Sequence, residues 1–172
     1  LKPMVGLVSL SFTTMLERLQ SAYTLGIRDF QFALPAWGPL TDDELILFIH
    51  QLCDPYPDCR FFHYNQIRSK RLLTIKDYEQ IACNVPNIVG EKFSTNSIAN
   101  ILDMAMSDCP LRFFLTEEGF GFGSLISDFG LLLSIASTNL GQAWEYFNSG
   151  KNGDYKKLTT MQQQLYSMTN RL

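Results

Sequence analysis

Residues 87–95 have the sequence Asn-Ile-Val-Gly-Glu-Lys-Phe-Ser-Thr, an apolar run with one glycine that ends in a single lysine. This run predicts a β-strand in which Ile88, Gly90 and Lys92 share one face, because strand side chains alternate with period two. Gly90 then leaves space beside Lys92. If that face lines a barrel, the apolar enclosure favours a neutral amine that attacks carbonyl carbon. The alternative is a solvated lysine that closes an ordinary strand.

A second apolar strand, residues 61–65, ends in Tyr64-Asn65, and Tyr64 precedes Lys92 by 28 residues. A strand that ends in Tyr-Asn followed by one that ends in Val-Gly-x-Lys resembles the dihydrodipicolinate synthase/N-acetylneuraminate lyase family. The similarity extends from Pro3 to the C-terminal helices. It implies a TIM barrel that binds pyruvate or a related 2-keto acid as a Schiff base. Lys92 would be the Schiff-base lysine and Tyr64 the proton-relay tyrosine.

The composition is that of an ordinary soluble domain. The chain has 172 residues, is 46% hydrophobic and 18% charged, and has a net charge of −3. This supplies one sizeable core and no basic surface for nucleic acid. No apolar run is long enough for a membrane span, and the N-terminus is not a signal peptide. We therefore expect a cytoplasmic protein without nucleic-acid or membrane partners.

The four cysteines and two histidines are not spaced like the ligands of a metal site. We expect reduced thiols, with a Cys53–Cys59 disulfide as the alternative that stays open.

The pattern of apolar residues and turn residues predicts six strand–helix units in one domain, residues 1–172. Strands are expected at 4–10, 28–34, 61–65, 88–92, 111–116 and 131–136, and helices at 12–25, 41–53, 74–83, 97–106, 139–147 and 154–172. The glycine-rich stretch 119–123 is expected to be a flexible loop. Such a rhythm suits a doubly wound sheet or a barrel.

A closed TIM barrel has eight units, so this chain would supply six of them plus C-terminal helices. Set against the family pattern, the chain begins at the third strand. The family's Gly-Thr-Thr-Gly-Glu motif, which holds the substrate carboxylate, has no match. We therefore expect a fragment, or a protein whose other units come from elsewhere.

Four further residues are assigned to substrate binding by the resemblance. Arg68 lies where the family binds the second substrate's carboxylate, although Lys70 and Arg71 compete for this role. Thr116 and Ser134 correspond to the lining of the keto-acid pocket. Trp37 replaces a relay tyrosine, and its indole N–H can only donate a hydrogen bond.

The resemblance thus implies a lyase that adds, cleaves or dehydrates through an enamine. Its substrates would be a 2-keto acid and an aldehyde, without metal or organic cofactor, and a homo-oligomer is compatible with it. One alternative is a truncated or degenerate, non-catalytic relative. Another is a doubly wound ligand-binding domain of unrelated function.

Overall fold

A computed structural model describes residues 2–169 of the chain and contains a sheet of six strands in the order β1-β2-β3-β4-β5-β6. The β1–β2, β2–β3 and β5–β6 pairs are parallel. The strands are β1 (Met4–Gly6), β2 (Asp29–Phe32), β3 (Arg60–Asn65), β4 (Ile88–Phe93), β5 (Arg112–Leu115) and β6 (Gly130–Leu131). This sequential order confirms the predicted barrel-type topology. It excludes a doubly wound sheet, in which the order would reverse.

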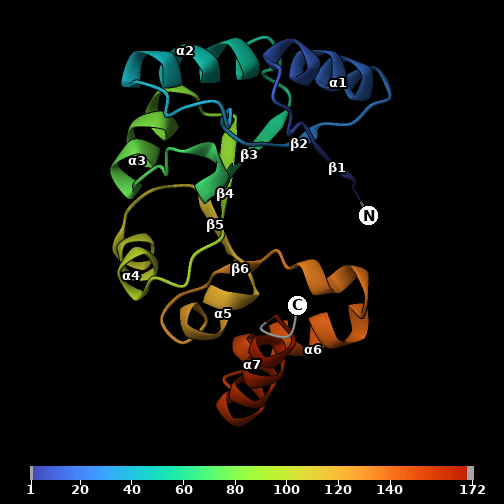
Figure 1. Ribbon diagram of the computed structural model, residues 1–172, viewed down its shortest axis with the longest axis vertical. Helices are drawn as coiled ribbons and strands as arrows, with labels where there is room; N and C mark the ends of the chain where they lie inside the picture. Colours follow the sequence, from blue (N-terminus) through green and yellow to red (C-terminus); the bar gives the residue numbers. More distant parts are fainter. Residues whose placement is uncertain (1, 170–172) are drawn as a thin grey trace. The chain divides into compact units, whose positions relative to one another are not determined.

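The helices follow the strands in alternation (Figure 1). They are α1 (Phe12–Thr24), α2 (Asp42–Cys53), α3 (Ile75–Asn84), α4 (Ile98–Met106), α5 (Glu117–Gly123), α6 (Leu140–Lys151) and α7 (Tyr155–Thr169), with the 3-10 turns η1 (Ile67–Ser69) and η2 (Ser134–Ser137). A capping box starts α2, because the Thr41 hydroxyl accepts from the Glu44 amide and the Glu44 carboxylate accepts from the Thr41 amide. Such a cap contributes on the order of 1 kcal/mol.

The chain divides into two compact units. Among the described residues, the first unit comprises 2–91 with 108–112, and the second comprises 92–107 with 113–169. Whether both belong to one folding domain stays a prediction.

The core of the first unit lies between its strands and the helices α1 and α2, which cover the same side of β1, β2 and β3 (Figure 1). Phe30 of β2 stacks on Phe61 of β3 at 5.8 Å between ring centroids, and Phe32 contacts Phe48 of α2. Met15 and Leu19 of α1 are fully buried. The alternation of apolar residues along β2 and β3 thus builds the face on which the helices pack.

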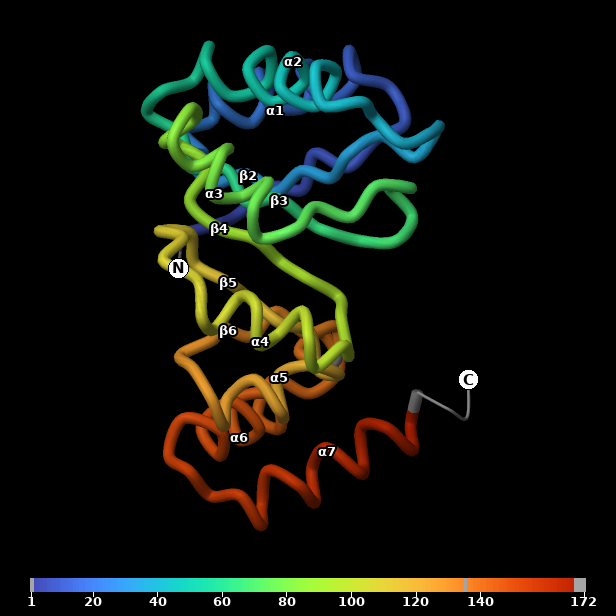
Figure 2. Tube along the Cα trace, turned by 90° about the vertical axis from the view of Figure 1, so that its left-hand side faces the viewer, coloured from blue at the N-terminus to red at the C-terminus, as the bar shows by residue number. Residues whose placement is uncertain are grey.

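The core of the second unit lies among α5, α6 and α7, which are neighbours in the trace (Figure 2). Phe120 of α5 contacts the rings of Tyr146 and Phe147 of α6, and Leu158 and Met161 of α7 are buried. Within this core, the stretch predicted as a flexible loop is helical, so that prediction is wrong. Its glycines serve close packing rather than flexibility.

The predicted last strand is also wrong in extent. Only Gly130–Leu131 pairs with β5, and the chain then enters η2 at Ser134. A short apolar run does not distinguish a strand from a buried turn. Ser134 is therefore an exposed residue at the start of a 3-10 turn and does not lie within a strand.

Candidate functional site

Three of the predicted site residues, Trp37, Tyr64 and Arg68, belong to the first unit. Tyr64 is the penultimate residue of β3 and is half-buried. Arg68 is exposed in η1, directly after that strand. Trp37 follows β2, is 76% exposed, and donates from its indole nitrogen to the carbonyl of Leu10 at 2.7 Å.

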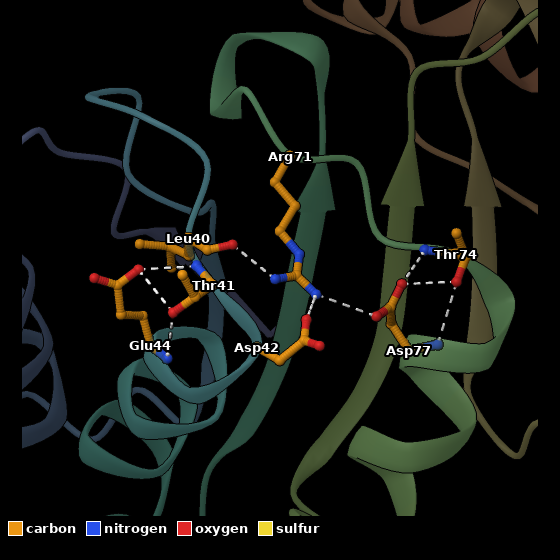
Figure 3. Close-up of polar contacts among 7 residues, drawn as sticks. All are labelled: Leu40, Thr41, Asp42, Glu44, Arg71, Thr74 and Asp77. Atoms are coloured by element: carbon orange, nitrogen blue, oxygen red, sulfur yellow. Dashed lines mark hydrogen bonds and ion pairs between the residues drawn. The ribbon is translucent and has the colours of Figure 1, made fainter.

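Arg71, the competitor of Arg68, has a structural role (Figure 3). Its side chain is only 16% exposed, and its guanidinium donates to the Leu40 carbonyl at 2.7 Å and pairs with Asp42 at 2.7 Å and with Asp77 at 3.3 Å. These bonds join the starts of α2 and α3. Arg71 is therefore the weaker candidate for binding a substrate carboxylate, and the assignment to Arg68, with Lys70 as its competitor, stays a prediction.

Gly90 of β4 does not leave the predicted gap, because the Phe62 ring and the backbone of β5 fill the space beside its Cα. A Cβ at this position would lie 2.7 Å from the Phe62 ring and 2.9 Å from the carbonyl oxygen of Arg112, closer than real side chains approach. Strand alternation places Lys92, two residues on and half-buried, on the Gly90 side of β4.

Lys92, Thr116 and Ser134 belong to the second unit. Thr116 follows β5 and precedes α5, and it is only 8% exposed. Its hydroxyl oxygen is buried and has no hydrogen-bond partner in the described structure. A buried hydroxyl of this kind can still bond a ligand. Ser134 shows no comparable burial.

The sequence did not reveal a cluster of buried polar residues in the first unit. Asn65 follows Tyr64, Glu91 precedes Lys92, and both are at most 1% exposed. The Asn65 amide nitrogen donates to Glu91 Oε1 at 2.8 Å and to the Leu73 carbonyl at 2.9 Å. The Leu73 amide in turn donates to Asn65 Oδ1 at 3.1 Å. Asn65 thus joins two strand ends and the Arg68 loop.

Two further buried side chains, His63 of β3 and Tyr78 of α3, complete this cluster. His63 Nδ1 lies 2.6 Å from the Tyr78 hydroxyl oxygen. Burial raises the pKa of Glu91 to about 7, although hydrogen bonds from Asn65 and Tyr78 oppose that rise. Burial lowers the pKa of His63 to about 3 and raises that of Tyr78. The signal in the sequence was an acidic residue within an apolar strand, but its hydrogen-bond partners Tyr78 and Asn65 lie 13 and 26 residues before it.

The remaining expectations about chemistry concern thiols, metals and membranes. Cys53 and Cys59 are both buried and free, and burial raises the pKa of both thiols. Within residues 2–169, no group of three or more metal-binding side chains gathers. Over the same range, none of the helices combines the length and apolar character needed to cross a membrane.

Comparison with known proteins gives a clear result for structure. No protein-family model matches the sequence, and no curated protein matches it either. The fold matches dihydrodipicolinate synthase from Bacteroides thetaiotaomicron with a TM-score of 0.83 at 21% identity, over 97% of this chain and 57% of that one. It matches a prophage protein belonging to the dihydrodipicolinic acid synthase family from E. coli K12, in complex with pyruvate, with a TM-score of 0.86 at 17% identity, over 97% and 58%. CdNal from Clostridium difficile, in complex with mannosamine, matches with a TM-score of 0.87 at 14% identity, over 99% and 59%.

These similarities establish the fold. The chain has the arrangement of part of a TIM barrel of the dihydrodipicolinate synthase/N-acetylneuraminate lyase type. It spans little more than half the length of these structures. At such low identity the comparison does not extend to residues, so the roles of Lys92, Tyr64, Arg68, Thr116, Ser134 and Trp37 stay predictions.

Proposed function

We propose that this chain is the catalytic part of a lyase that forms a Schiff base with pyruvate or a related 2-keto acid. The observation that carries the proposal is that β3 and β4 are neighbours and end in Tyr64-Asn65 and Lys92-Phe93. The structural similarity to a protein in complex with pyruvate supports the choice of substrate.

In this proposal Lys92 supplies the nucleophile. Its neutral amine adds to the keto carbon, and the carbinolamine loses water as the C=N bond forms. The Tyr64 hydroxyl donates the proton that the departing hydroxide needs. The Tyr64 phenolate left by that donation then takes a proton from the adjacent carbon, which gives an enamine. The enamine attacks an aldehyde carbonyl and forms a carbon–carbon bond or, in the reverse direction, forms when that bond breaks and the aldehyde leaves. Water then hydrolyses the imine, which releases the keto acid and restores the Lys92 amine. Thr116 and Arg68 would bind substrate oxygens.

The test is borohydride trapping with pyruvate, applied to the full-length product of the coding sequence, because the chain spans little more than half of its structural relatives. Intact mass measures adduct formation, and peptide mapping locates it. We expect the adduct on Lys92, its loss in Lys92→Ala, and trapping about 100-fold slower in Tyr64→Phe. Lys76→Ala, which changes an exposed lysine of α3, is the matched control.

One alternative function is favoured by a specific observation. No match to the family's carboxylate-binding Gly-Thr-Thr-Gly-Glu motif occurs in these 172 residues. If pyruvate gives no adduct, or an adduct on a lysine other than Lys92, the chain is a non-catalytic relative that retains the fold.

A further inference from the structure

The cluster of buried polar side chains between α3 and the strands β3 and β4 takes no part in the proposed chemistry. Glu91 and Asn65 face α3 and the segment before it, whereas Lys92 and Tyr64 are each one residue along the strand and so project to its other side. These buried side chains cannot contact a substrate bound on the opposite side of the sheet. They can act only through the backbone that they hold.

We propose that Asn65 and Glu91 are positioning residues, whose hydrogen bond fixes the strand ends from which Tyr64 and Lys92 project. The inference rests on the proposed function. The Asn65 amide makes three hydrogen bonds: its nitrogen donates to Glu91 and to the Leu73 carbonyl, and its oxygen accepts from the Leu73 amide. A single side chain therefore sets the register of β4, the end of β3 and the start of the segment that leads into α3.

The hydrogen-bonded pair of Asn65 and Glu91, here called the clamp, includes one ionisable group, because burial raises the pKa of the Glu91 carboxyl to about 7. An ionised Glu91 accepts a stronger hydrogen bond from Asn65 than a neutral one does. The titratable side chains that act on Glu91 or on its partners come from β3, from α3 and from the segment before β5: His63, Asp77, Tyr78 and Cys109. Since burial holds His63 neutral and Tyr78 protonated, Glu91 is the member whose protonation changes near pH 7.

The first arm of the test compares trapping rates for pyruvate as a function of pH and pyruvate concentration. Glu91→Gln keeps the shape and removes the ionisation. We expect it to lower the maximal rate about fivefold at pH 8, to leave half-saturation unchanged, and to remove the step near neutrality from the pH profile. Glu79→Gln, on the exposed side of α3, should leave rate and profile at wild-type values.

Asn65→Asp provides a reciprocal variant. It places two carboxylates together, and we expect a rate loss of about tenfold or more. The double variant Asn65→Asp, Glu91→Gln restores one donor and one acceptor with the roles exchanged. We therefore expect it to recover to within about threefold of the Glu91→Gln rate.

The second arm measures amide hydrogen exchange and needs no activity. Relative to the other slowly exchanging amides of the same protein, those of residues 64–66 and 91–93 should exchange about fivefold faster in Glu91→Gln than in the Glu79→Gln control. If the wild-type protein forms the adduct and Glu91→Gln matches it in rate, pH profile and exchange, the clamp is refuted while the proposed function stands. If the wild-type protein forms no adduct, the function is refuted, and unchanged exchange at these amides would refute the clamp separately.

Discussion

At the scale of single residues, His63 and Glu91 oppose each other in their effect on stability. The pKa of Glu91 rises from 4.5 to about 7 on folding, so ionisation of this carboxyl destabilises the native state as pH rises across that interval. The pKa of His63 falls from 6.5 to about 3, so protonation of the unfolded chain destabilises the native state as pH falls across that interval. Between about pH 4.5 and 6.5 the two effects cancel.

Removing either group should make the effect of the other on the pH dependence of stability measurable. In Glu91→Gln, the free energy of unfolding relative to wild type should increase from pH 4.5 to pH 7, by on the order of 3 kcal/mol. In His63→Gln, the free energy of unfolding relative to wild type should be highest at low pH and should decline as pH rises toward 6.5. Urea unfolding at several pH values measures both. Parallel pH profiles for wild type and Glu91→Gln would show that Glu91 titrates normally in the native state.

The sequence singled out Lys92 and Tyr64 as candidates but did not reveal their buried neighbours Glu91 and Asn65. A lysine after Val-Gly and a tyrosine at a strand end are local patterns, and each is visible within a few residues. The hydrogen bonds of Asn65 and Glu91 depend on which side of each strand meets α3 and its preceding segment, and that is set only when the elements pack.

At the scale of elements, the segment between β3 and α3 contains a largely buried arginine, Arg71, and an exposed one, Arg68, and we predict that only Arg71 stabilises the fold. Arg71→Ala would leave a carbonyl and two carboxylates without their common partner, at a site where the side chain is largely buried. We expect a loss of about 2–3 kcal/mol in the free energy of unfolding. Arg68→Ala should leave stability within about 0.5 kcal/mol, since that side chain is exposed. Denaturant unfolding measures both losses, and equal losses for the two variants would contradict a structural role that is specific to Arg71.

The helix α5 is held by tertiary packing despite three glycines. A Cβ on Gly119 would lie 2.5 Å from the carbonyl oxygen of Thr95, a backbone atom that cannot move aside. Gly119→Ala should therefore destabilise by on the order of 2 kcal/mol, even though alanine is the better helix former.

Gly141 of α6 is the matched control for this prediction. A Cβ added to Gly141 would have its nearest neighbour, Asn139 Oδ1, at 3.6 Å. Gly141→Ala should therefore stabilise the protein by about 0.5–1 kcal/mol. Thermal unfolding of the two variants tests the pair, and a stabilised Gly119→Ala would contradict the packing argument. The local glycine content predicted a loop because neighbours from distant elements are not visible in it.

At the scale of the whole molecule, the order of the six strands followed from the spacing of strand–helix units and from the resemblance, and it is confirmed. The last strand was predicted too long because Leu131 to Ala136 is apolar throughout, and only pairing with β5 decides where such a run stops being a strand. The capping residues Thr41, Thr74 and Ser97 set helix starts that the sequence placed within one residue.

The sequence predicts one domain, whereas the structure contains two compact units, and the two tryptophans allow a direct test. Trp37 belongs to the first unit and Trp144 to the second, so Trp144→Phe and Trp37→Phe each leave one reporter. Both β4 and β5 contribute residues to both units, so neither unit can unfold without disrupting strands of the other. We therefore expect the two fluorescence transitions in urea to coincide with each other and with circular dichroism. Midpoints that differ between the two reporters would show that the units unfold separately and would overturn the single-domain prediction.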